Sequence, residues 1–309
     1  MKIGLHTGPQ RCTFDDLRRL WRIAEDTGFH QVSVWDHFYD DPSAVGDGPN
    51  FEAVATLAAL ASETERVRIV VYAFCVGYRH PAVLANAAVT IDHISNGRFE
   101  IGLGAGWLEK EYRAYGIPFP PVGVRMDILE ESVQIIRSMF QDERTNFRGA
   151  HFTMTDAICQ PKPVQKRLPI WVCGGGEKRT LRMAARYGDK WNIPYPSPEV
   201  FKQKNAVLDE WCDKEGRDGG EILRSANVGL FLGANQAEAK KKRAQFEKMF
   251  GERAPVQAGG MLIGTPSEAT DRIGEYVDAG AQNVNVVMRA PFDFDGLQLF
   301  VEEVKPAFE

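Results

Sequence analysis

The sequence predicts an α/β fold, a (β/α)₈ TIM barrel, and three observations lead to this prediction. Short runs of β-branched residues alternate with helix-like stretches, and the pair recurs eight times along the 309 residues. No Ser/Gly-rich linker divides the chain, so a single domain over 1–309 is expected. The first strand leads into Thr7-Gly8-Pro9-Gln10 and not into G-x-G-x-x-G, which disfavours the rival fold, a doubly wound dinucleotide-binding sheet.

The first half of the chain contains four of the predicted strand–helix pairs. Strands are expected over 2–7, 31–36, 67–74 and 99–106. Helices are expected over 14–28, 51–65, 81–95 and 125–141, with Asp15 and Asp16 at the start of the first helix and Gly28 at its end. An insertion rich in proline and aromatic residues delays the fourth helix, and 147–152 is expected to form a β-hairpin.

The second half of the chain continues the same alternation. Strands are expected over 169–173, 190–195, 224–232 and 283–288. Helices are expected over 178–187, 197–215, 236–250, 266–279 and 294–304. Two helices follow the seventh strand, so insertions are predicted after strands 4 and 7 of the barrel.

The composition argues against several classes of protein. Lys and Arg total 37 against 42 Asp and Glu, so the chain lacks the basic excess of a nucleic-acid binder. The N-terminus has no apolar signal segment and no run approaches the roughly 18 apolar residues of a membrane span. The five cysteines are scattered without a C-x-x-C motif and are expected to be reduced. We therefore expect a cytoplasmic protein without nucleic-acid or membrane partners.

Asp36 and His37 are the strongest candidates for catalysis. They follow the second predicted strand, and the loops after the strands carry the functional site of such barrels. An imidazole exchanges protons near neutral pH, and a carboxylate beside it can fix its charge or orientation. The alternative for this dipeptide is a polar start of a loop.

Three consecutive glycines follow the fifth predicted strand. Gly174, Gly175 and Gly176 precede Lys178 and Arg179. Backbone N–H groups at a strand-to-helix turn can hold a phosphate, which suggests the phosphate tail of a cofactor. The alternative is a tight turn that needs positive φ, which glycine adopts at little steric cost.

The segment 102–106 has glycine at three of its five positions, which lets a flat ring approach the barrel floor. Close backbone packing is the alternative. Trp107, Phe74 and Trp191 would add apolar walls, although each of them alone is more often a core residue. A planar, hydrophobic, small-molecule ligand is therefore expected.

A metal-dependent hydrolase is the natural rival, because histidines and carboxylates at barrel strand ends also bind metals. His6 lacks the partner of an H-x-H motif, no H-E-x-x-H is present, and no histidine lies at the ends of strands five to eight. We therefore expect no metal site.

Six motifs carry a family resemblance. They lie at 34–38, 78–81, 94–107, 115–120, 160–163 and 174–181, and include Trp35-Asp36-His37-Phe38 and Gly104-Ala105-Gly106-Trp107. Over essentially its whole length the chain resembles the luciferase-like flavin and deazaflavin oxidoreductases, specifically their coenzyme F420-dependent branch. The resemblance implies a homodimer and a barrel with F420 along its C-terminal mouth.

The resemblance also implies roles for single residues. Asp36 and His37 would flank the reactive face of the deazaflavin, with His37 donating or accepting a proton. The ring would rest over the turn after strand three, where the match implies a non-prolyl cis peptide at Tyr72-Ala73. The residues implied to bind the cofactor are Asp36, Tyr72, Ala73, Phe74, Ala105, Gly106, Gly174, Gly175, Gly176, Lys178 and Arg179.

The substrate is less well indicated than the cofactor. Sugar-phosphate dehydrogenases of this branch have a glutamate where this chain has Trp107, so a sugar phosphate is disfavoured and Trp107 and Trp191 are expected to line an apolar substrate pocket. The resemblance implies hydride transfer between C5 of F420 and a small organic substrate, and we expect reduction of an activated C=C or C=N bond. The alternatives are an FMN-dependent two-component monooxygenase and a non-catalytic protein that binds a deazaflavin or flavin.

Overall fold

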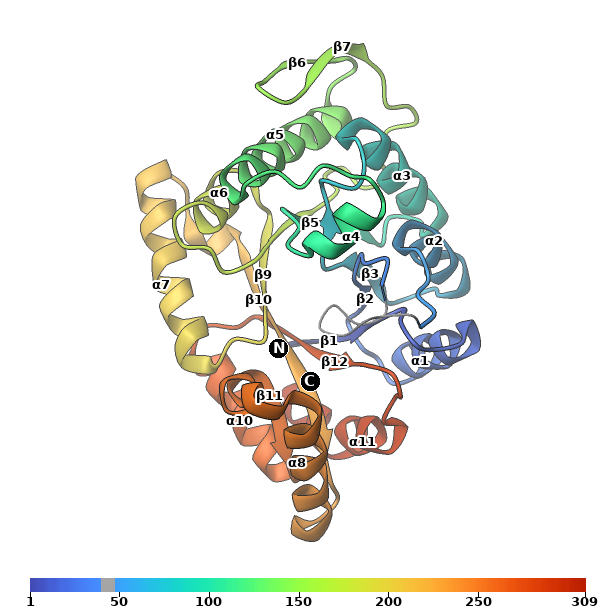
Figure 1. Ribbon diagram of the computed structural model, residues 1–309, viewed down its shortest axis with the longest axis vertical. Helices are drawn as coiled ribbons and strands as arrows, with labels where there is room; N and C mark the ends of the chain where they lie inside the picture. Colours follow the sequence, from blue (N-terminus) through green and yellow to red (C-terminus); the bar gives the residue numbers. More distant parts are fainter. Residues whose placement is uncertain (40–47) are drawn as a thin grey trace.

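Eight parallel strands form a closed barrel in the computed structural model, which describes residues 1–39 and 48–309 (Figure 1). Around the ring the order is β1, β2, β3, β5, β8, β9, β10 and β12, and β12 pairs with β1 to close it. The strands are β1 Lys2–Thr7, β2 Gln31–Val34, β3 Arg68–Val71, β5 Phe99–Gly104, β8 Ile170–Cys173, β9 Lys190–Pro194, β10 Leu223–Leu232 and β12 Asn283–Met288. The predicted TIM barrel is confirmed.

Helices surround the barrel (Figure 1). They are α1 Phe14–Asp26, α2 Ala53–Glu63, α3 Pro81–Ile94, α4 Glu109–Ala114, α5 Val122–Gln141, α6 Thr180–Tyr187, α7 Pro198–Glu215, α8 Gln236–Phe250, α9 Ala254–Gln257, α10 Pro266–Asp278 and α11 Phe294–Leu299. A π-helical turn, Phe300–Val304, continues α11 to the end of the predicted helix.

The local sequence explains why these elements form. In α1, the buried side chains Leu17, Leu20, Trp21 and Ala24 recur at helical spacing and face the barrel. A capping box between Thr13 and Asp16 starts this helix. All six residues of β12 are buried, as expected for a parallel strand covered on both faces.

Two segments add elements to the simple alternation. Between β5 and β8 lie α4, α5 and the hairpin of β6 Thr145–Arg148 and β7 Thr153–Ala157. After β10 come α8, α9 and β11 Met261–Gly264. Strand β11 pairs with residues 229–232, the C-terminal end of the ten-residue β10. The hairpin and α8 project at opposite ends of the molecule (Figure 1).

The structure corrects several predicted bounds. The strand expected over 67–74 is two strands, β3 and the short β4 Phe74–Cys75, which pairs with β5. The helix expected from 125 starts at Val122. Helix α4 and strand β11 were not predicted, because six and four residues are too short to show a period within segments rich in proline, glycine and aromatic residues.

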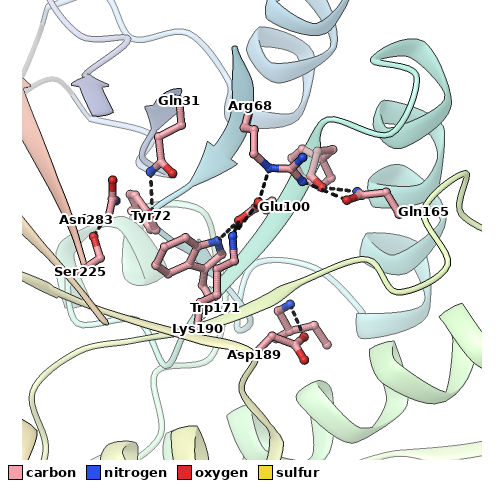
Figure 2. A network of polar contacts seen from close by, with 12 residues as sticks. Gln31, Arg68, Tyr72, Glu100, Gln165, Trp171, Asp189, Lys190, Ser225 and Asn283 are labelled. Atoms are coloured by element: carbon pink, nitrogen blue, oxygen red, sulfur yellow. Dashed lines mark hydrogen bonds and ion pairs between the residues drawn. The ribbon is translucent and has the colours of Figure 1, made fainter. Parts of the chain in front are cut away.

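A network of charged and polar side chains lies in the interior of the barrel (Figure 2). The fully buried carboxylate of Glu100 accepts hydrogen bonds from Lys190 Nζ at 2.7 and 2.8 Å and from Trp171 Nε1 at 2.6 Å, and it pairs with Arg68. Burial alone would raise the pKa of Glu100, but Lys190 and Arg68 hold it below its ordinary value. This network ties β3, β5, β8 and β9 together.

Candidate active site

A cavity of about 440 Å³, which we call the mouth cavity, opens at the C-terminal ends of the barrel strands. Each of the eight strands, or the residues directly after it, contributes to the lining: His6, Asp36, Tyr72, Gly104, Gly174, Tyr195, Asn227 and Arg289. Of the residues that the sequence singles out, the lining contains Asp36, His37, Tyr72, Ala73, Ala105, Gly106, Trp107 and Gly174.

His37 is held at this cavity by a carboxylate that the sequence did not identify. His37 Nδ1 lies 2.8 Å from Glu111 Oε2, and Glu111 is fully buried on the short helix α4. An ionised carboxylate can only accept, so Nδ1 carries the hydrogen of this bond. The other ring nitrogen, Nε2, is therefore the atom with which His37 can exchange a proton in the cavity.

Glu111 also organises the chain around His37. Its Oε1 accepts hydrogen bonds from the backbone amides of Phe38 and Tyr39 at 2.7 and 2.8 Å, and its Oε2 accepts from Tyr78 Oη at 2.6 Å. Burial would raise the pKa of Glu111, but the hydrogen bonds from His37, Tyr78 and Tyr39 hold it below its ordinary value. The carboxylate is thus ionised without a Lys or Arg within 4.0 Å in the described residues.

Asp36 is paired with Arg79. Its Oδ2 lies 2.7 Å from Arg79 Nη1 and accepts from the amide of Cys75 at 3.0 Å, and its Oδ1 lies 3.0 Å from Arg79 Nη2. Burial raises the pKa of Asp36, and the guanidinium of Arg79 opposes this shift. Because both oxygens are occupied, Asp36 fixes the position of the loop that carries His37.

The turn after β3 forms one wall of the mouth cavity. The peptide bond between Tyr72 and Ala73 is cis, which confirms the bond implied by the resemblance. Tyr72 Oη accepts from Gln31 Nε2 at 2.7 Å, and its ring packs edge-on against Trp171 (Figure 2). Burial raises the pKa of Tyr72 well above its ordinary value, so its hydroxyl is protonated.

The glycine loop joins β8 to α6. Gly174 lies at the cavity with φ of 122°, and a Cβ at Gly175 would come within 2.7 Å of Ile193 Cδ1. Within residues 1–39 and 48–309, the amides of Gly175 and Gly176 donate to no backbone acceptor. The positive φ of Gly174 supports a turn that needs glycine, and binding of a phosphate by the amides stays a prediction.

Six predicted site residues do not line the mouth cavity: Phe74, Gly175, Gly176, Lys178, Arg179 and Trp191. Phe74 is fully buried in β4 and does not line the mouth cavity. Trp191 faces away from the cavity, stacks on Phe201 with ring centroids 5.4 Å apart, and donates to Gly174 O at 2.8 Å. Arg179 lies 2.7 Å from Asp127 and 3.3 Å from Glu130 of α5, so its charge is already paired. Trp191 thus supports the glycine loop from behind.

Other polar and aromatic residues complete the mouth. Trp107 is 62% exposed and packs edge-on against His37, with ring centroids 5.6 Å apart. His6 Nδ1 lies 2.8 Å from Ser33 Oγ, and burial, together with nearby Arg289, lowers the pKa of His6 to about 3. His6 is therefore neutral, which leaves His37 as the histidine of the cavity suited to proton transfer.

Metal-ligand clusters and membrane-spanning helices are both absent from the described part of the chain. No three or more His, Cys, Asp and Glu side chains there come together in a group suited to a metal ion. None of its helices combines the length and apolar character needed to span a bilayer.

Comparisons with known proteins agree with this architecture. The family model described as luciferase-like monooxygenase matches residues 1–283. The chain is 31% identical over 308 residues to an F420-dependent glucose-6-phosphate dehydrogenase of Amycolatopsis mediterranei (strain U-32), covering 92% of this chain and 91% of that protein. It is 30% identical over 225 residues to pyrimidine monooxygenase RutA of Enterobacter cloacae, covering 71% and 56%.

Among solved structures, an F420-dependent secondary alcohol dehydrogenase in complex with an F420-acetone adduct has a similar fold. It gives a TM-score of 0.88 at 21% sequence identity, over 100% of this chain and 99% of that chain. The two chains therefore share the same fold over their full length.

Proposed function

Because the chain belongs to the luciferase-like monooxygenase family, we propose that it is an F420-dependent oxidoreductase that reduces an activated C=C or C=N bond of a small organic molecule. The observation that carries this proposal is the placement of His37 at the mouth cavity, with Nδ1 held by the buried Glu111. A proton donor of fixed orientation beside a cavity for a planar ligand suits a reduction that adds one hydride and one proton.

The residues of the mouth fit coenzyme F420. The cavity of about 440 Å³ lies within the usual size of a small-molecule site, and its lining includes Tyr72-Ala73 and the neighbouring glycine-rich backbone at 104–106. The unpaired amides of Gly175 and Gly176 suit the phosphate of the tail, and the exposed Lys178 follows them in the same loop. Gly174, Gly175, Gly176 and Lys178 are therefore proposed to hold the tail, and Tyr72, Ala73, Ala105 and Gly106 the ring.

The chemistry divides between coenzyme and protein. Reduced F420, when bound, supplies a hydride from C5 of the deazaflavin. His37 delivers a proton from Nε2 to the atom of the double bond that does not receive the hydride, and then takes a proton from solvent. The double bond becomes a single bond, so the two electrons and two hydrogens are accounted for without a further oxidant or reductant.

The remaining residues position these groups. Glu111 keeps the hydrogen on Nδ1 of His37, and Asp36 and Arg79 hold the loop in place. Trp107 stands where sugar-phosphate dehydrogenases of the F420-dependent branch have an acidic group, and its indole lines the mouth cavity beside His37. A weakly polar substrate suits this wall better than a sugar phosphate does.

Parallel titration of the purified protein with F420 and with FMN tests the proposal. We expect a spectral change at lower concentration for F420, because preference for this coenzyme separates the oxidoreductase from the FMN-dependent monooxygenase suggested by relatives such as the pyrimidine monooxygenase. Preference for FMN would overturn the proposal.

A substrate panel then separates an enzyme from a non-catalytic binding protein. The protein loaded with reduced F420 is mixed with an enone, an imine and a ketone, while a secondary alcohol and a sugar phosphate are tested with oxidised F420. We expect oxidation of reduced F420 by the enone or the imine. The homodimer and the cytoplasmic location stay predictions, and the mass of the purified protein in solution checks the first of them.

A further inference from the structure

A second cavity, which we call the side cavity, lies next to the mouth cavity. It has a volume of about 320 Å³ and shares Tyr195 and Arg289 with the mouth cavity. Its walls come from β10, β12 and the loop after it, and from α8 and β11, which follow the seventh barrel strand. Its lining includes the apolar residues Leu230, Phe231, Met249, Phe250, Met261, Val287, Met288, Pro291 and Phe292.

Tyr195 and Arg289 form the partition between the two cavities. Arg289 Nη2 and Nε donate to Tyr195 Oη at 3.0 and 3.3 Å, and the guanidinium lies 4.9 Å from the centroid of the Trp35 ring. In the described residues no Asp or Glu carboxylate lies within 4.0 Å of this guanidinium. The partition is therefore held by one hydroxyl and by ring stacking, and exposed Arg289 can move aside at small cost.

Two of the three charged residues of the side cavity pair with each other. Lys242 Nζ and Asp293 Oδ2 are 2.6 Å apart, and both residues belong to the lining. The third, Arg289, lies at the border with the mouth cavity, and beyond it an anionic ligand would lie among methionine and phenylalanine side chains, where an unpaired charge is costly. Transfer of a hydrocarbon chain from water into this apolar cavity is favourable, and methionine side chains adapt to its shape.

We propose that the side cavity takes the apolar arm of the substrate, which is an amphipathic molecule with its reacting bond beside His37 and a hydrocarbon chain that passes Tyr195 and Arg289. This inference rests on the proposed function, because it places the reacting end in the mouth cavity. It narrows the substrate class from small organic molecules to those with an unbranched or flat apolar chain.

Straight-chain 2-ketones provide the probe, because oxidised F420 cannot reduce them. The protein saturated with oxidised F420 is titrated by calorimetry with ketones of about four to about ten carbons. We expect the affinity to rise about fourfold for each added methylene until the cavity is full, as burial of a methylene predicts.

Two tryptophan variants on α8 test whether the hydrocarbon chain of the ketone lies in the side cavity. Met249 and Lys248 are both exposed, and of the two only Met249 lines the side cavity. We expect Met249→Trp to fill the cavity, leaving the shortest ketone unaffected and weakening the longest at least tenfold, whereas Lys248→Trp behaves as the unchanged protein. The same chain-length dependence in both variants, or none in the unchanged protein, would overturn the inference.

The design separates the two proposals. If F420 does not bind, the proposed function fails, and the ketone series on the protein without coenzyme still compares Met249→Trp with Lys248→Trp. If F420 binds and the two variants show the same ketone affinities, the proposed function is retained and the side cavity has no role in substrate binding.

Discussion

Glu100 and Glu111 are both fully buried carboxylates of the same barrel, and the structure holds them by opposite means. Glu100 lies in the barrel interior between Arg68 and Lys190, so two cations compensate its charge. Glu111 lies at the mouth, where an imidazole, a phenol and two amides donate to it and no Lys or Arg among the described residues is within 4.0 Å. The comparison indicates that a carboxylate between Lys and Arg side chains stabilises strands, whereas one held by an imidazole, a phenol and two amides fixes the orientation of those donors.

The first prediction concerns the interior. Glu100→Gln leaves Arg68 and Lys190 without their counter-charge, so we expect the free energy of unfolding to fall by about 3 kcal/mol, the low end for a broken buried ion pair because both cations are partly exposed. Denaturant unfolding measures this loss. Turnover per folded molecule should stay unchanged. A loss below about 1 kcal/mol would show that the ion pairs of Glu100 do not stabilise the barrel, and the proposed difference between Glu100 and Glu111 would be wrong.

The second prediction concerns the mouth. Glu111→Gln keeps the shape of the side chain but removes the charge that holds Nδ1–H of His37, and we expect turnover to fall about 10- to 100-fold, as for other groups that orient a reacting side chain. Binding of F420 should change by no more than a few-fold. The exposed Glu109 of the same helix pairs with Arg113 instead, and Glu109→Gln is the matched control with unchanged turnover.

A double variant tells positioning from general stability. If Glu111 acts through His37, Glu111→Gln should lower turnover no further once His37→Ala is present. Additive losses in the double variant would mean that Glu111 acts independently of His37.

The third prediction concerns acid stability. The pKa values of Glu100 and Glu111 are lowered in the folded chain, so their contribution is present above the pKa of about 4.3 of an unfolded glutamate and is lost as the pH falls through the folded values. Thermal unfolding between about pH 7 and pH 3 should show falling stability below about pH 5. Glu100→Gln and Glu111→Gln should each make this fall shallower. A fall of unchanged steepness in either variant would show that its carboxylate does not titrate in this window.

The smallest expected effect lies in the glycine loop. Lys178→Ala removes one exposed cation near the unpaired amides, so affinity for F420 should fall only a few-fold, and affinity for its phosphate-free ring fragment should not change. Arg179→Ala is the control, because Asp127 and Glu130 already pair its guanidinium. Equal losses for both ligands in Lys178→Ala would show that Lys178 does not contact the phosphate.

Local sequence patterns were sufficient to predict the barrel and several residues at its mouth. The recurring strands and helices indicate the barrel, and the ends of its strands point to Asp36, His37 and Gly174 at one mouth. Family resemblance supplied the position of the cis bond at Tyr72-Ala73. Trp191 could have been placed better from the sequence, because side chains alternate along a strand and the polar Asn192 beside it faces the barrel interior.

Contacts between residues far apart in the sequence could not be predicted from local patterns. Glu111 belongs to a helix of six residues and contacts a histidine 74 positions away, and nothing in the local sequence distinguishes it from Glu109. Arg179 is paired by acids about 50 positions earlier on α5. The side cavity likewise joins segments on either side of β11, a strand of four residues that shows no period.

Turnover of the His37→Ala variant loaded with reduced F420 tests the proposed mechanism most directly. The substrate is the member of the panel that the unchanged protein reduces, and binding of F420 is measured in the same preparation. We predict that binding changes by no more than a few-fold while turnover falls by about 10²–10⁴, the usual effect of removing a general acid or base. Unchanged turnover with F420 bound would contradict the assignment of His37 as the proton donor.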